Sequence, residues 1–182
     1  MNRTIYPCLA FMLLLFSAAC SSTEPEPKKT DEAAAPAAPA SVDMISGTWV
    51  LNVAKSKYSP ADLAPKSGTV KYELQPDGSI NGTTDGVDSK GRKTHSEYTA
   101  KLDGAAVPSN NTSDGKPSPD VDSVAWKKID DRNYELTQSL KGQTVYTFKI
   151  AIAEDGKSRT STQTGKNAQG QAVNNEVFYD KQ

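Results

Sequence analysis

Apolar and polar residues alternate along most of the chain after residue 44, which is the pattern of strands with one buried face. In the run 69–75, Val70, Tyr72 and Leu74 fall on one face, and Lys71 falls on the other. Turn-forming Gly, Asp, Asn and Pro residues separate this run from its neighbours, so the pattern predicts about nine strands. The other predicted strands are one that begins at Gly47 and those over 79–87, 92–102, 121–129, 134–140, 143–153, 158–164 and 173–179.

Short turns between consecutive strands favour an antiparallel arrangement in which each strand pairs with the next. Closing such a sheet into a barrel removes its exposed edges. We therefore expect an all-β fold, a single antiparallel up-and-down meander that forms a closed or nearly closed barrel of about eight to ten strands. Residues 105–120 are rich in Pro, Asn, Ser and Gly and are predicted to form a long loop. The only helical turn that the pattern allows after residue 44 lies over 59–63.

The first twenty residues have the layout of a bacterial lipoprotein signal. Arg3 precedes an apolar run over 9–19, which is too short to span a bilayer, and small residues lie directly before Cys20. Lipoprotein processing lipidates such a Cys and cuts before it. We therefore expect lipidation at Cys20 and a place in the bacterial cell envelope, at the periplasmic face of the outer membrane. Residues 17–19 also fit an ordinary signal peptidase site, and in that alternative the protein is soluble in the periplasm or secreted.

Residues 20–43 lie outside the strand pattern. They are rich in Pro, Ala and charged residues, a composition that cannot build a core and that favours extended conformations. We expect three parts: a lipoprotein signal peptide at 1–19, the lipidated Cys20 with a disordered tether at 20–43, and a β-barrel-like domain at 44–182. The expected partner at the N-terminus is the membrane, through the lipid.

The charge of the chain is nearly balanced, with 21 basic and 22 acidic residues. This balance provides no basic field to attract nucleic acid, so nucleic acid is excluded as an expected partner. If Cys8 is removed with the signal and Cys20 is lipidated, no thiol is left for a disulfide. The domain must then be stabilised by its own hydrophobic core.

The run Gly47-Thr48-Trp49 resembles the Gly-x-Trp motif that opens lipocalin-like (calycin) β-barrels. The resemblance implies that Trp49 closes one end of the barrel and that an Arg of a late strand, here Arg159, stacks on it. The chain also resembles, over a greater length, a group of uncharacterised secreted bacterial proteins. This second resemblance implies export and a similar fold but no activity, and it rests on residues 47–57, 130–132, 167–171 and 179–182.

The sequence offers little that is typical of catalysis or metal binding. His95 is the only histidine, so a typical zinc site lacks further ligands of this kind. A Ser-His-acid triad would have to use His95, and the sequence has no Gly-x-Ser-x-Gly motif to supply its nucleophile. Residues 110–115 faintly resemble a calcium loop, but Val121 stands where a Glu would close it. Paired carboxylates lie beside turn residues, where Asp commonly caps the turn. These pairs are Asp85 with Asp88, Asp120 with Asp122, and Asp130 with Asp131. We therefore expect no enzymatic activity, no metal and no cofactor.

The expected inner faces of the strands mix apolar residues with polar ones, namely Gln138, Ser123, Thr160 and Thr162. Such a lining can leave a partly polar cavity of the kind that lipocalin-type barrels use for small apolar ligands. We expect a non-catalytic envelope lipoprotein that binds or carries a small apolar ligand. The alternative is a structural or interaction module displayed on a membrane tether, without a ligand pocket. The residues that would contact a ligand are not assigned by the sequence.

Overall fold

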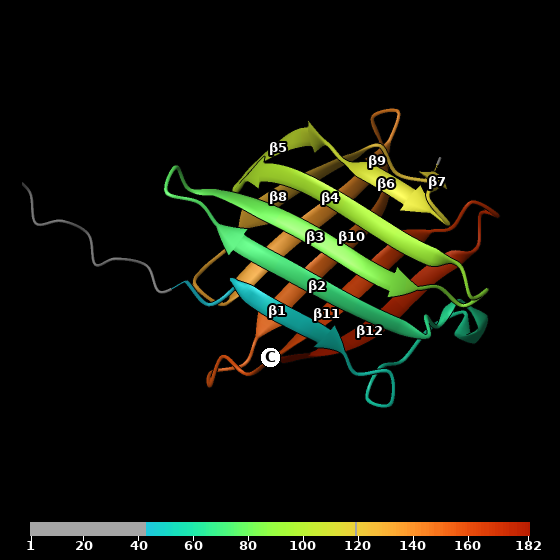
Figure 1. Ribbon diagram of the computed structural model, residues 1–182, viewed down its shortest axis with the longest axis horizontal. Helices are drawn as coiled ribbons and strands as arrows, with labels where there is room; N and C mark the ends of the chain where they lie inside the picture. Colours follow the sequence, from blue (N-terminus) through green and yellow to red (C-terminus); the bar gives the residue numbers. More distant parts are fainter. Residues whose placement is uncertain (1–42, 119) are drawn as a thin grey trace, which may run out of the picture. The chain divides into compact units, whose positions relative to one another are not determined.

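The computed structural model describes residues 43–118 and 120–182, which fold into one antiparallel sheet of twelve strands curled into a barrel-like shape (Figure 1). A short 3-10 helix, η1 (Ala61–Leu63), follows the first strand. Within the described part of the chain, no helix has the length and apolar character needed to cross a membrane. The predicted signal, Cys20 and almost all of the predicted tether lie outside the described residues.

The sheet is a meander in which most strands pair with their neighbours in sequence. Its order is β5-β8-β9-β10-β11-β12-β1-β2-β3-β4-β6-β7, and the pairing of β1 with β12 joins the two halves of the chain. In Figure 1, β1 to β4 form the near wall and β8 to β12 form the far wall. The strands are β1 (Gly47–Leu51), β2 (Ser67–Leu74), β3 (Ser79–Val87), β4 (Lys93–Lys101), β5 (Asp103–Pro108), β6 (Asn110–Ser113), β7 (Lys116–Pro117), β8 (Ser123–Lys128), β9 (Asn133–Leu140), β10 (Gln143–Ile152), β11 (Ser158–Lys166) and β12 (Ala172–Lys181). The all-β antiparallel meander with a barrel-like curl is confirmed.

The segment 105–120 is not the long loop that its composition predicts. It contributes to β5, β6 and β7, which add three strands to the nine expected ones. β5 pairs with β8, at one end of the sheet order, whereas β6 pairs with β4, near the other end. Only Ser109 separates β5 from β6, so the two ends of the sheet meet along one continuous stretch of chain. Because β4 and β8 offer edges that need partners, tertiary pairing overrides the weak local strand propensity of this segment.

The alternation of buried and exposed residues along each strand shows which side chains point into the barrel. The faces predicted for β2 are correct at Val70 and Tyr72, each 4% exposed, while Leu74 is exposed at the end of the strand. The faces predicted for β11 are wrong: Arg159 and Ser161 are buried, and Thr160 and Thr162 belong to the outward face. The sequence of β11 is polar throughout, so its own pattern does not distinguish the two faces, and a shift of one residue exchanges them.

The predicted inner face is also wrong for Ser123 in β8, but it is correct for Gln138 in β9. Ser123 belongs to the outward face of β8, because the next residue, Val124, is buried. Gln138 pairs with Val124 across the two strands and therefore shares the inner face, as predicted.

The hydrophobic core fills one end of the barrel, which we call the closed end. Trp49 and Trp126 are both fully buried there, and the Trp49 indole donates a hydrogen bond to the carbonyl oxygen of Ile45 at 2.8 Å. The rings of Tyr72 and Tyr134 meet Trp126 edge-on, with ring centroids 5.1 and 6.3 Å away. Such edge-to-face contacts add to the gain from burying large apolar surfaces. The opposite end carries fewer large apolar residues, and we call it the open end.

Candidate functional site

A cavity of about 900 Å³ lies at the open end of the barrel. Its lining comes from η1, the loop between β3 and β4, Asp120, the end of β9, the start of β10, the end of β11, the loop that follows it and the start of β12. Leu63, Leu140, Tyr146 and Val173 supply apolar surface, and polar and charged residues surround them. A half-open cavity of this size, with apolar walls and a few polar groups, is typical of small-molecule sites.

One wall of the cavity is polar and internally hydrogen-bonded. The Asn175 side-chain amide donates to Gln163 Oε1 at 2.9 Å, and Asn175 Oδ1 accepts a hydrogen bond from the backbone of Ser59 at the same distance. Asn175 is buried, and its partners hold it in a fixed orientation. This wall of β11 and β12 is therefore a preorganised polar surface inside the barrel.

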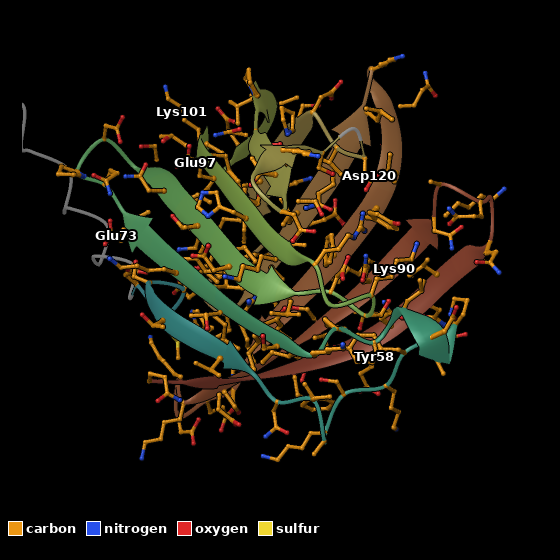
Figure 2. The ribbon with its side chains drawn as sticks, turned by 45° about the vertical axis from the view of Figure 1, so that its right-hand side comes forward. Tyr58, Glu73, Lys90, Glu97, Lys101 and Asp120 are labelled. Carbon is orange, nitrogen blue, oxygen red and sulfur yellow. The ribbon has the colours of Figure 1, made fainter. Side chains whose placement is uncertain are left out.

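Charged side chains surround the mouth of the cavity, where Figure 2 shows Lys90 and Asp120. Arg92 forms a 2.7 Å ion pair with Asp88, and both residues line the cavity. Burial alone would raise the pKa of Asp88, but hydrogen bonds from the backbone and side chain of Arg92 bring it below its ordinary value. Lys166 adds a further positive charge to the lining. The rim thus combines both signs of charge and does not by itself select one sign of ligand.

The structure brings Trp49 and Arg159 together at the closed end. The Arg159 guanidinium carbon lies 5.4 Å from the centroid of the Trp49 ring, and it lies closer still to Tyr179, at 4.1 Å, and to Tyr72, at 5.2 Å. Lys181 approaches the Trp49 ring with its Nζ 4.9 Å from the centroid. Stacking of a cation on aromatic faces is favourable, and it is stronger where water is excluded.

Two tyrosines of this end, Tyr179 and Tyr98, have pKa values raised above the ordinary value and stay neutral over the physiological pH range. Burial raises the pKa of Tyr179 to about 12, although the positive charge of Arg159 opposes the shift. Burial also raises the pKa of Tyr98 well above its ordinary value, and the neighbouring Tyr72 adds to the increase. The hydroxyls can donate or accept hydrogen bonds, but they do not supply the negative charge that would neutralise Arg159.

His95 lies away from the cavity, on the outer face of β4. Its Nδ1 lies 2.7 Å from Asp85 Oδ1, and its Nε2 lies 3.7 Å from Glu97 Oε2. The hydrogen bond with Asp85 raises the pKa of His95, and the charge of Glu97 contributes in the same direction. Residues 110–113 of the calcium-like run form β6, and no group of three or more His, Cys, Asp or Glu residues suited to a metal ion occurs within 43–118 and 120–182.

One carboxylate of each remaining pair, Asp122 and Asp130, accepts hydrogen bonds from the backbone of a turn. Asp122 accepts a 2.7 Å hydrogen bond from the backbone of Lys141, and Asp130 accepts one of 2.8 Å from the backbone of Arg132. These backbone hydrogen bonds lower the pKa values of both carboxyls. Neither Asp122 nor Asp130 lines the cavity at the open end.

The polar wall of the cavity, formed by Gln163 and Asn175, was not predicted from the sequence. Asn175 falls in phase with the buried Val173 and Val177, so the alternation in β12 contained a signal for it. Gln163 offered no comparable signal, because every neighbour in β11 is polar or small. A comparison of the chain with protein-family models, with curated proteins and with solved structures finds no match.

Proposed function

We propose that this protein is a non-catalytic lipoprotein of the cell envelope whose lipocalin-like barrel binds a small molecule at its open end. The observation that carries the proposal is the cavity of about 900 Å³, whose apolar walls meet an ordered polar wall. Small-molecule sites commonly have volumes of roughly 300–1,000 Å³, so the cavity is large enough for a ligand.

The lining favours an amphipathic ligand over a wholly apolar one. Leu140, Tyr146 and Val173 can cover an apolar body, whereas the amide N–H groups of Gln163, whose Oε1 alone bonds to Asn175, require polar partners or water on their side of the cavity. A purely hydrocarbon ligand would remove water from these groups without replacing its hydrogen bonds. We therefore refine the expected small apolar ligand to one with an apolar body and polar groups.

The alternative function, an interaction module without a pocket, has less support. Such a module would present a continuous apolar patch to its partner. The large hydrophobic residues exposed in the described part of the chain are Val53, Leu74 and Ile129, which come from three different segments. The cavity offers a more developed binding surface than these residues do.

Binding of the neutral fluorescent probe N-phenyl-1-naphthylamine tests the proposal. The mature chain, residues 20–182 with Cys20→Ser, avoids the detergent that a lipidated protein requires. We expect saturable binding with one probe per chain. Leu140→Trp should weaken it by at least about tenfold, because the larger side chain enters the cavity.

Leu74→Trp makes the same substitution on a half-exposed residue at the end of β2, outside the cavity lining. This control should leave binding unchanged. Absence of saturable binding in the unsubstituted chain, or equal loss in both variants, would contradict a small-molecule site at the open end.

A further inference from the structure

Arg159 is a buried cation without an anionic partner. It is 3% exposed and is the one charged residue among the buried residues of 43–118 and 120–182. The ion pairs formed within these ranges all use other basic side chains. Its only side-chain hydrogen bond to a described residue runs from Nη1 to Ser161 Oγ at 3.3 Å, and its Nε finds no partner there.

The aromatic rings around Arg159 compensate only part of this burial. Tyr179, Tyr72 and Trp49 interact with the positive charge of the guanidinium through their ring electrons. The guanidinium also carries five N–H donors, and rings do not replace conventional acceptors for them. Because burial of an unpaired charge is costly, the site is incomplete in electrostatic terms.

A ladder of inward-facing polar residues connects Arg159 to the cavity. This polar ladder consists of Arg159, Ser161 and Gln163, which occupy successive inward positions on β11. Two residues of a strand advance by about 7 Å, so each member lies one layer nearer to the mouth than the one before. The bond from Arg159 to Ser161 shows that the guanidinium extends toward the mouth, and Gln163 at the other end of the ladder lines the cavity.

We propose that the cavity takes up an amphipathic anion head first and that its carboxylate, sulfonate or phosphate group pairs with Arg159 below the cavity floor. This inference rests on the proposed small-molecule site and adds the chemical class and orientation of the ligand. An anionic group would supply acceptors for the unused N–H donors and the missing negative charge. Ser161 and Gln163 would form hydrogen bonds with the anionic group along its path, while the apolar walls would cover the rest of the ligand.

Two ligands that differ only in their head group test this proposal. Dodecanoate and dodecan-1-ol are used to displace N-phenyl-1-naphthylamine from the mature Cys20→Ser chain. We expect a preference for dodecanoate of about tenfold or more, the size of a charge-assisted hydrogen bond. Arg159→Met should remove this preference, and Arg159→Lys should retain part of it because the charge remains.

The control variant is Lys149→Met, which removes a positive charge from an exposed position of β10 outside the cavity lining. It should retain the preference for dodecanoate. A preference that survives Arg159→Met, or that disappears in Lys149→Met, would show that Arg159 does not set the preference and would overturn the inference. Equal displacement by both ligands in the unsubstituted chain would also overturn it, while leaving the small-molecule site intact. Failure of the probe itself to bind would overturn the small-molecule site.

A second measurement does not depend on the stability of the Arg159→Met variant. The Nε–H group of Arg159 gives its own nuclear magnetic resonance signal, which is assigned by its loss in Arg159→Lys. We expect dodecanoate to shift this signal and dodecan-1-ol to leave it nearly unchanged, since only the anion pairs with the guanidinium. An unchanged signal at saturating dodecanoate would contradict the proposal.

Discussion

At the scale of single residues, the closed end depends on a few large side chains that pack around one cation. Trp49 is fully buried, donates its indole N–H to Ile45 and shares the space around Arg159 with Tyr179. The Gly-x-Trp resemblance implied the proximity of Trp49 and Arg159, and the structure places the two side chains together. The tyrosines could not be inferred in the same way, because their proximity depends on the register of strands far apart in the sequence.

Removal of the Trp49 side chain should destabilise the protein strongly. Trp49→Ala leaves a large cavity in the core and an unpaired carbonyl at Ile45, so we expect a loss of about 3–5 kcal/mol in the free energy of unfolding. Urea denaturation measures the change. As a control, Val53→Ala on an exposed residue should cost less than about 1 kcal/mol. A similarly small loss in Trp49→Ala would contradict the packing at the closed end.

His95 should titrate above its ordinary pKa because it is hydrogen-bonded to Asp85. A pKa raised in the folded state means that its stabilising contribution is present at low pH and is lost as the pH rises through that raised value. The effect on stability is small, since both side chains are solvent-accessible. A nuclear magnetic resonance titration of the single histidine should show a lower pKa in Asp85→Asn and a smaller decrease in Glu97→Gln. An unchanged pKa in Asp85→Asn would contradict the pairing.

At the scale of elements, the sequence predicted the strands with clear alternation and failed where alternation was weak. The buried pair Val70 and Tyr72 fixed the inner face of β2 in advance. In β11, both faces are polar, so the alternation does not identify the inward residues; the pairing with β12 places Ser161 on the same inner face as Arg159. The strands β5 and β6 were missed for a related reason, because they are completed by the edges of β8 and β4 and not by their own composition.

A glycine on β3 should be necessary for the packing of two neighbouring strands. Gly82 pairs with Tyr98 of β4, and a Cβ atom at Gly82 would collide with the Tyr98 ring. Gly82→Ala should therefore cost about 1–3 kcal/mol in the free energy of unfolding, measured in urea.

Gly68→Ala provides a matched control on the adjacent strand. A Cβ atom there would make an ordinary contact with Leu51 at 3.5 Å, so the change in stability should stay within about 1 kcal/mol. Equal stability of the two variants would show that the Tyr98 ring does not lie against Gly82.

At the scale of the whole molecule, the barrel has one filled end and one open end, and we propose a lipid anchor at Cys20. The alternation of residues predicted the barrel, but neither the volume nor the polar wall of the cavity could be derived from it. These features depend on how Gln163 and Asn175 meet across two strands. The anchor rests on the sequence around Cys20, and its test is independent of the fold.

Lipidation should depend on Cys20 and not on Cys8. The unsubstituted protein is expected in the membrane fraction with acyl chains on its N-terminal Cys, and Cys20→Ser should lose these chains and leave the membrane. Cell fractionation and mass spectrometry of the intact protein measure both effects. Cys8→Ser, which changes the predicted signal only, should remain anchored. A soluble protein that begins with an unmodified Cys20 would contradict the lipoprotein assignment.

The most direct test of the central claim is native mass spectrometry of the protein purified from its own envelope. We predict a species heavier than the lipidated chain by the mass of one small molecule. This added mass should be strongly reduced in Leu140→Trp, whose larger side chain enters the cavity, and should persist in Leu74→Trp, which lies outside the cavity lining. Spectra in which every species is accounted for by the chain and its lipid, together with no saturable probe binding, would contradict a ligand-binding barrel.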